Sequence, residues 1–312
     1  MSHAAWQACV DASLAGPPRV AGPLSGYRSL AGGTLAAADL VRRSGGRAVP
    51  VIYGRSAEGR PLWAVRVGDG PLRVLYVANL HAMEFIGSEV VLALLERLVD
   101  DPMPGIEAWL IPFANPDGRV RAEVNAANGR RRFVRHNGRG VDLNRNFAVG
   151  FRADYWMHRL IPALYNPGAE PFSEPEAAAL RDLCATHPPG RAISFHAFGG
   201  WIFHPWSCRA DPTPDDGRFS ALAARMAEAM RRPYRCAQLG RWARWFRAHG
   251  SEIDHLYGDL GTMAFLIEVS RGGLEARSPS TWADPLAWFN PRDPVPDVQN
   301  VLLAALALAT AE

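Results

Sequence analysis

Two residues at the end of a predicted buried strand have the types and spacing of metal ligands. His81 and Glu84 follow a nearly unbroken apolar run over residues 72–80, which is typical of a strand covered on both faces. Apolar residues at 90–98 then recur with helical spacing. An imidazole and a carboxylate three residues apart can reach one Zn²⁺, and a third ligand leaves the fourth position for water. Because open α/β sheets bind ligands where strands end, this position favours a functional site.

Spacing alone decides little, because short motifs often arise by chance. A second pair of the same type, His249 and Glu252, occurs later in the chain. On spacing alone, a structural role is the favoured interpretation of either pair.

Two further polar residues lie at predicted strand ends. His196 follows the apolar strand 192–195 and gives a third candidate zinc ligand beside His81 and Glu84. Glu268 lies near the end of another apolar strand, where a charge is rare unless it is paired or functional. Glu268 is therefore either a buried ion-pair partner or a general base for a metal-bound water.

The segment 141–147 is dense in hydrogen-bonding side chains. Arg145 together with Asn144 could hold a carboxylate, because a guanidinium matches a carboxylate in a bidentate fork.

Composition places the chain among ordinary soluble globular proteins. It has 312 residues, of which 48% are hydrophobic and 21% charged, and a net charge of +3. So small a net charge does not favour nucleic acids or acidic membranes as binding partners. No apolar run reaches membrane-spanning length. The four cysteines form no Cys-x-x-Cys pair, which argues against a structural zinc cluster. The N-terminus lacks the pattern of a signal peptide, so we expect a cytoplasmic protein.

The order of apolar segments predicts an α/β fold with one mixed, mostly parallel twisted sheet and helices on both faces. We expect an N-terminal arm over residues 1–26 and a single catalytic domain over residues 27–312. Strands are predicted at 49–53, 62–67, 72–80, 107–113, 192–195, 234–239 and 262–269, and helices at 35–43, 88–98, 173–187, 215–231, 251–258 and 298–311.

Residues 119–147 are predicted to form a long polar loop that carries seven arginines. Such a loop is usually functional or disordered, and its arginines could contact phosphates of a nucleic acid. Asp117 and Glu123 flank or interrupt these arginines. Together with the small net charge, this disfavours a nucleic-acid binder.

Six motifs occur in a fixed order after YGRSAEGRPL. They are HAMEF, NPDG, RFVRHNGRGVDLNRNF, SEPEA, SFHAF and FLIEVS. Each motif alone is modest, but together they resemble the zinc metallocarboxypeptidases of the carboxypeptidase A type, the M14 peptidase family. The resemblance runs from about Tyr27 to the C-terminus, nearly the whole chain.

The resemblance implies one Zn²⁺ per chain, bound by His81, Glu84 and His196. Asp142 would orient a zinc-bound histidine, and Arg135 would polarise the scissile carbonyl and stabilise the oxyanion.

The same resemblance implies that Asn144 and Arg145 bind the substrate's terminal carboxylate and that Glu268 acts as general base and then acid. The implied fold is the zinc carboxypeptidase-like (phosphorylase/hydrolase-like) form. The implied activity is hydrolysis of the C-terminal peptide bond, with a peptide or small amide bearing a free carboxylate as partner. His249 and Glu252 then fall in the loop that shapes the side-chain pocket, and no longer count as a metal site.

The chain departs from the family at substrate contacts. The tyrosine that closes over bound substrate corresponds to Phe246, a second tyrosine to Phe198, and an arginine before the ligand glutamate to Met83. Two alternatives stay open, the first because of these losses. One is a zinc amidohydrolase for a non-standard amide, such as a γ-glutamyl cell-wall peptide or an N-acyl amino acid. The other is a zinc-binding protein without catalysis, which the presence of base and oxyanion arginine disfavours.

The floor of the side-chain pocket corresponds to Ile253. An apolar floor favours an apolar terminal residue, because it gives a buried charge no partner. The carboxylates of Glu252, Asp254 and Asp259 lie within a few residues of Ile253. If the loop swings one of them into the pocket, the pocket would accept a basic side chain instead.

Overall fold

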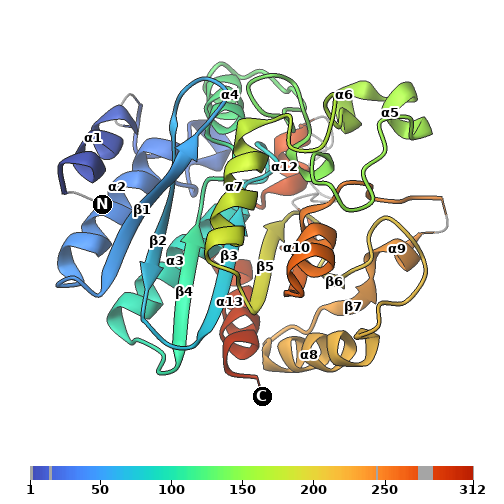
Figure 1. Ribbon diagram of the computed structural model, residues 1–312. Coiled ribbons are helices and arrows are strands. Elements are labelled where there is room, and N and C mark those ends of the chain that lie inside the picture. The colour runs from blue at the N-terminus through green and yellow to red at the C-terminus, as the bar shows by residue number, and fades with distance from the viewer. Residues whose placement is uncertain (1–2, 14–15, 244, 273–283, 312) are drawn as a thin grey trace.

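An eight-stranded sheet runs through the centre of the molecule, in the order β1-β2-β4-β3-β5-β8-β6-β7 (Figure 1). The computed structural model describes residues 3–13, 16–243, 245–272 and 284–311. The strands are β1 (Ala48–Arg55), β2 (Pro61–Val67), β3 (Leu72–Ala78), β4 (Ile106–Ile111), β5 (Arg191–His196), β6 (Trp201–His204), β7 (Arg235–Gln238) and β8 (Met263–Glu268).

The sheet is mixed and mostly parallel, as the sequence predicted. Strands β4, β3, β5 and β8 are parallel neighbours, and β6 is parallel to β7. Antiparallel pairs join β1 to β2, β2 to β4 and β6 to β8. Because β3, β5 and β8 run side by side in one direction, their carboxyl ends meet at one edge of the sheet.

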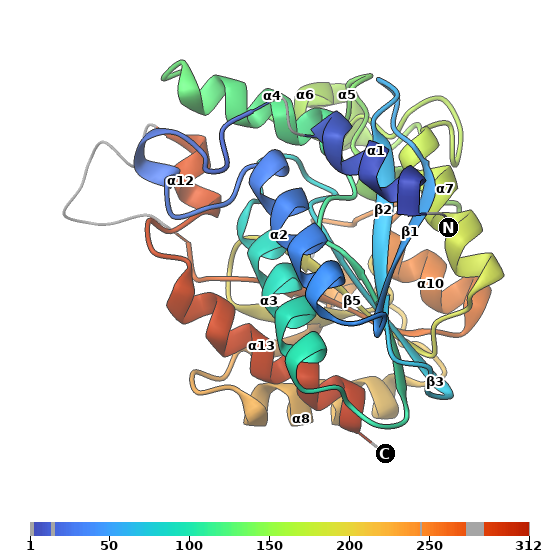
Figure 2. The same cartoon turned by 90° about the vertical axis from the view of Figure 1, so that its left-hand side faces the viewer.

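Helices cover both faces of this sheet. Figure 2 shows α2, α3 and α13 on one side of the strands and α7 and α10 on the other. The helices are α1 (His3–Ser13), α2 (Leu30–Arg43), α3 (Ile86–Asp100), α4 (Pro116–Ala127), α5 (Trp156–Leu160), α6 (Pro162–Tyr165), α7 (Pro175–Thr186), α8 (Asp216–Ala229), α9 (Leu239–Trp242), α10 (Glu252–Leu260), α12 (Pro285–Phe289) and α13 (Val295–Thr310), with short 3₁₀ turns η1 (Gly22–Leu24) and η2 (Leu143–Arg145).

Strand β3 explains why the apolar run in the sequence is unbroken. Val74, Tyr76 and Ala78 belong to the hydrophobic cluster that includes α3 and α13. Leu75 and Val77 point the other way, into the cluster that includes α7 and α10. Successive side chains of a strand face opposite sides, so both halves of this alternation are buried. Each buried Val or Leu side chain contributes about 1.5–3 kcal/mol of transfer free energy.

The predicted loop 119–147 is only partly a loop, because α4 occupies residues 116–127. The side chain of Asn115 accepts a hydrogen bond from the Gly118 N–H at 3.0 Å and caps the helix, with Pro116 in its first turn. The NPDG segment therefore starts a helix as well as making a turn. The helix was missed because its exposed face is polar and its apolar residues show little helical periodicity.

The expected N-terminal arm packs on the domain. Trp6 and Val10 of α1 are buried in the same cluster as α3, and the Trp6 ring lies edge-on to Trp63 at a centroid distance of 5.5 Å. The described part of residues 1–26 therefore shares the core of the chain that follows.

None of the four cysteines forms a disulfide. No described helix is both long enough and apolar enough to cross a membrane. The cytoplasmic location stays a prediction.

The buried side chain of Asn79 makes several hydrogen bonds within the turn after β3. Its backbone is left-handed, with φ of 64°. Its amide nitrogen donates to the carbonyl oxygens of His81 at 3.0 Å, Ala82 at 3.3 Å and Glu84 at 3.4 Å. Asparagine tolerates the left-handed region better than most residues, and here the same residue also satisfies the carbonyls of the turn that presents His81 and Glu84.

We expect Asn79→Ala to lower the free energy of unfolding by about 2–3 kcal/mol, since it orphans buried carbonyls and strains the backbone. Chemical denaturation measures this loss. Asn79→Gly is the matched control, because glycine relieves the strain without restoring the hydrogen bonds, so its loss should be smaller. An alanine variant as stable as the parent would contradict this role of Asn79.

Candidate active site

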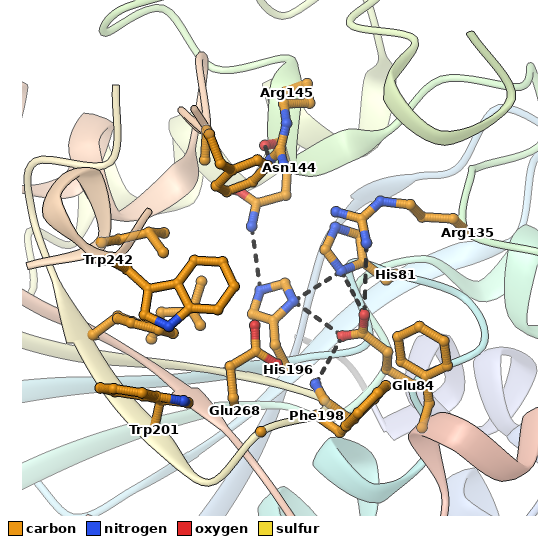
Figure 3. A pocket seen from close by; sticks show the side chains of 18 of the residues that line it. His81, Glu84, Arg135, Asn144, Arg145, His196, Phe198, Trp201, Trp242 and Glu268 are labelled. Atoms are coloured by element: carbon orange, nitrogen blue, oxygen red, sulfur yellow. Dashed lines mark hydrogen bonds and ion pairs between the residues drawn. The ribbon is translucent and has the colours of Figure 1, made fainter. Parts of the chain in front are cut away.

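Two imidazoles and one carboxylate meet at the carboxyl edge of β3 and β5 (Figure 3). Glu84 lies between the histidines, with its carboxylate oxygens 2.8 Å from Nδ1 of His81 and 3.0 Å from Nδ1 of His196. The two Nδ1 atoms are 2.9 Å apart, and all three residues are buried. The group could hold a metal ion. Two histidines and one glutamate are the protein ligands of a catalytic zinc site.

The spacing of these donor atoms fits one metal ion. Bonds of about 2.0–2.1 Å at tetrahedral angles place ligand atoms roughly 3.3 Å apart. The observed 2.8–3.0 Å separations require only a small opening of the group.

The sheet brings the three ligands together across more than a hundred residues of sequence. His196 is the last residue of β5, and β5 is the parallel neighbour of β3, whose following turn carries His81 and Glu84. The Ala197 N–H donates to Glu84 at 3.1 Å, which ties the end of β5 to that turn.

A buried carboxylate lies behind one of the histidines. Asp142 is 3.2 Å from Nε2 of His81, the ring atom that faces away from Glu84. Asp142 also accepts hydrogen bonds from Nε of Arg135 at 2.7 Å and from the Asn144 N–H at 3.1 Å. This geometry is that of a carboxylate that fixes the tautomer of a metal-binding histidine.

The electrostatics of the group favour positive charge. Burial alone would lower the pKa of His196, but hydrogen bonds to Glu252 and Glu84 raise it to about 10. Burial would likewise raise the pKa of Glu84, yet the charge of His81 and the hydrogen bond from His196 hold it well below its usual range. Because a ligating histidine must be neutral, a metal cation would take the place of the proton on His196.

The group opens into a cavity of about 510 Å³. Its lining divides into a polar and an apolar part (Figure 3). The polar part is His81, Glu84, Arg135, Asn144, Arg145, His196 and Glu268, and the largely apolar part is Tyr165, Ala197, Phe198, Gly199, Trp201, Phe203, Leu239, Trp242, Phe246, Ala248, Leu266 and Phe289.

Glu268 lies beside the metal-binding group, because β8 pairs with β5 and places Glu268 opposite His196. Its Oε2 atom is buried and has no hydrogen-bond partner among the described residues. Burial and the negative charge of Glu84 raise the pKa of Glu268 to about 8. Glu268 thus forms no ion pair with another described residue, and a carboxylate with a free oxygen next to a metal site can take a proton from water.

Arg145 supplies an unpaired positive charge. It is 3% exposed, and no carboxylate of the described residues forms an ion pair with it. Its guanidinium lies over the rings of Tyr165 and Phe246, at 5.3 and 5.9 Å from their centroids. Since an isolated buried charge is costly, this cation suits an anionic ligand in the cavity.

The structure places the pocket floor differently from the sequence prediction. Phe246 lines the cavity as expected, but Ile253 does not; it is fully buried in the cluster between the sheet and α10. The reason is that α10 starts at Glu252 and turns Ile253 into the core. Leu266, Phe203 and other residues of the strands supply the apolar surface instead.

The nearby carboxylates do not turn into the cavity. Asp254 accepts hydrogen bonds from the backbone N–H groups of Ser207 and Cys208 at 2.7 and 2.9 Å. Asp259 pairs with His255 at 2.7 Å. Glu252 pairs with His196, at 3.1 Å from Nε2.

The other departures from the family pattern also have places in the structure. Phe198 lines the cavity, whereas Met83 is buried in the hydrophobic core. His249 is hydrogen-bonded to the Gly150 carbonyl at 3.1 Å and belongs to no metal-binding group of the described residues.

Sequence reasoning missed several residues of the site. Tyr165, Trp201 and Trp242 line the cavity, and no spacing or strand-end position distinguished them from ordinary core aromatics. The contact of Glu252 with His196 was also missed, although the second His-x-x-Glu pair had drawn attention to that residue.

The family model of the M14 peptidases, described as zinc carboxypeptidase, matches residues 36–284. With this match over most of the chain, the protein belongs to the M14 zinc carboxypeptidase family.

Individual relatives agree with this family. Mouse carboxypeptidase A2 is 25% identical over 243 residues, covering 72% of this chain and 57% of that protein. Carboxypeptidase A from Helicoverpa armigera has the same fold, with a TM-score of 0.75 at 21% identity over 99% of this chain and 80% of that one. Bovine thrombin-activatable fibrinolysis inhibitor, in complex with a tick inhibitor, gives a TM-score of 0.74 at 20% identity over 91% of this chain and 96% of that one.

We expect His196→Ala to abolish stoichiometric zinc binding, because it removes one of three converging donors. Metal analysis of the dialysed protein measures the loss. His249→Ala is the matched control, since it removes a histidine outside the group and should leave zinc content unchanged. Undiminished zinc in the His196 variant would remove His196 from the metal site.

Proposed function

We propose that the protein is a zinc-dependent carboxypeptidase that hydrolyses the C-terminal peptide bond of peptides. One cavity holds His81, Glu84 and His196 as ligands of a single Zn²⁺, Glu268 as a base and Arg145 as an anion-binding group. The unpaired, buried cation of Arg145 beside the metal-binding group is the observation that carries the proposal.

The residues of the chain divide the chemistry between them. A bound Zn²⁺ polarises a carbonyl and lowers the pKa of its water. Glu268 takes a proton from the attacking water through its free oxygen and passes it to the leaving amine. Arg135, with Nη1 at 3.7 Å from Glu84, directs positive charge toward the developing oxyanion.

Arg145 and Asn144 determine which peptide bond of the substrate is cleaved. Both line the cavity beside the metal-binding group, so a carboxylate held there places the adjacent peptide bond near Glu268. Binding a free carboxylate requires a chain end, which favours exopeptidase over endopeptidase action.

The apolar lining favours an apolar or aromatic terminal residue. Trp201, Phe203, Phe246 and Leu266 surround the part of the cavity away from the charged groups. None of these side chains offers a carboxylate to a buried cation, so a basic terminal residue would be penalised.

A second candidate is hydrolysis of a non-standard amide, such as a γ-glutamyl link or an N-acyl amino acid. Phenylalanines at 198 and 246 line the cavity without a hydroxyl, and this observation keeps the candidate. C-terminally amidated and free peptides, tested beside γ-glutamyl and N-acyl substrates, separate the two. Cleavage of ordinary free peptides above all others supports the carboxypeptidase.

A small peptide is the proposed partner. Some arginines of segment 119–139 are engaged within the protein: Arg119 is fully buried, with its Nε donating to Glu123 at 2.6 Å, and Arg121 pairs with Glu58 at 2.6 Å. These contacts disfavour the nucleic-acid interpretation. The proposed location is the cytoplasm.

Glu268→Gln should keep zinc yet reduce kcat/KM by roughly 100- to 10,000-fold, as expected when a catalytic base is removed. Steady-state kinetics on a peptide with a C-terminal phenylalanine, together with metal analysis, measure both quantities. Substantial turnover by the zinc-loaded variant would assign the base to another residue.

We expect the enzyme to prefer C-terminal Phe or Leu over Arg. Ala248→Phe should lower kcat/KM for a terminal Phe more than for a terminal Ala, because the new ring fills the apolar part of the cavity. Ile253→Val is the matched control, since Ile253 lies outside the lining and its variant should keep the preference. Preference for terminal Arg in the parent enzyme, or a change of preference only in the Ile253 variant, would refute this assignment.

A further inference from the structure

A second buried carboxylate lies behind the metal-binding group. Glu252, the first residue of α10, is fully buried, and its Oε1 is 3.1 Å from Nε2 of His196. This contact mirrors that of Asp142 with Nε2 of His81 at 3.2 Å. Each of the two histidines thus has a carboxylate on the ring atom that faces away from Glu84.

The tautomer of His196 requires such an acceptor. Its Nδ1 faces Glu84 and His81, so metal binding through Nδ1 leaves the proton on Nε2. Nε2 has three neighbours: Ser194 Oγ at 3.0 Å, Glu252 Oε1 at 3.1 Å and Asn144 Nδ2 at 3.3 Å.

Only one of these neighbours is a charged acceptor. The amide nitrogen of Asn144 is a donor and cannot accept the proton of Nε2. The Ser194 hydroxyl can itself donate to Glu252, with which it forms a hydrogen bond. A hydrogen bond to a carboxylate is stronger than one to a neutral oxygen, so Glu252 is the group that holds His196.

The backbone of Glu252 orients a second residue of the site. Its N–H donates to Oδ1 of Asn144 at 3.0 Å. This bond fixes which end of the amide faces away from α10, so that Nδ2 points toward His196 and the cavity (Figure 3). Because the Nε2 N–H of His196 donates its hydrogen bond to Glu252, the Nδ2 donor of Asn144 is left for the carboxylate of a substrate.

A role in selecting basic terminal residues fits these contacts poorly. The carboxylate of Glu252 does not line the cavity. Its second oxygen, Oε2, accepts from the Ser251 hydroxyl at 3.4 Å. The side chain is therefore fully engaged on the far side of His196.

We propose that Glu252 is a positioning residue. It holds His196 in the tautomer that binds metal through Nδ1, and it holds Asn144 with its amide nitrogen toward the substrate. The inference rests on the metal site and the activity proposed above, and it assigns the N-terminus of α10 a function in metal retention.

The test is the rate at which the zinc-loaded protein releases its metal to excess 4-(2-pyridylazo)resorcinol, measured without substrate. Glu252→Gln keeps the shape of the side chain but removes its charge, and release should be roughly 10- to 100-fold faster than in the parent. Asp142→Asn should accelerate release to a similar extent. In the cobalt-substituted protein, both variants should also change the visible absorption spectrum of the metal.

The matched control is Asp254→Asn. It removes a buried carboxylate from the same helix, two residues further on, whose partners are backbone N–H groups remote from the metal-binding group. It should release zinc at the parental rate. If Glu252→Gln does not fold, Glu252→Asp, which keeps the charge but shortens the side chain, takes its place in the same comparison.

Parental release rates in a folded Glu252 variant, or equal acceleration by Asp254→Asn, would overturn the inference. A switch of terminal preference with unchanged zinc release would make Glu252 a specificity residue instead. Because the release assay contains no substrate, accelerated release in a protein that cleaves no peptide would refute the proposed function and leave the inference standing.

Discussion

The balance of buried charge at the carboxyl edge of the sheet is the constraint on which the site depends. Glu84, Asp142 and Glu252 surround two histidines in a region with almost no solvent exposure. Such a group of carboxylates is stable only beside compensating positive charge. Arg135 supplies part of it through Asp142. His196 lies between two of these carboxylates, Glu84 and Glu252, whose hydrogen bonds raise its pKa and favour its positively charged form. A divalent cation satisfies the same requirement without protonating a ligand.

The sheet topology makes that concentration of charge possible. Parallel pairing of β3 with β5 and of β5 with β8 places three strand ends side by side. Each strand is largely apolar, and polar residues lie at or just after its carboxyl end, so folding of the core brings the chemistry to one edge of the sheet. The remaining ligand geometry comes from local hydrogen bonds. Asn79 shapes the turn that carries His81 and Glu84. The first residue of helix α10, Glu252, contacts His196 on the side of the ring that faces away from Glu84.

The predictable part of the molecule is the part in which local pattern and tertiary position agree. The strand 72–80 was evident because both its faces are buried, and the strand ends then identified His81, His196 and Glu268. The predictions that were wrong concern features that depend on contacts between distant segments of the chain. Helix α4 has a polar face and weak periodicity, so its cap at Asn115 was interpreted as a turn. Correspondence with the family placed Ile253 in the pocket, but the rotation of α10 decides which of its residues face the cavity, and a one-dimensional pattern does not contain that rotation.

Two groups of the cavity bear on the substrate that we propose. Among the described residues, Arg145 is a buried cation without a carboxylate partner, and Glu268 has a buried oxygen without a hydrogen-bond donor. Each arrangement is costly in a dry cavity, and neither group neutralises the other, since no ion pair joins them. Both costs are offset when a ligand brings a carboxylate to Arg145 and a water stands between Glu268 and the metal ligands. Under the proposed activity, the substrate then carries its carboxylate close to the bond that is hydrolysed, and its side chain is left to occupy the apolar space beside Phe246. A chain end with one residue beyond the scissile bond meets both conditions, whereas the interior of a peptide meets only the second.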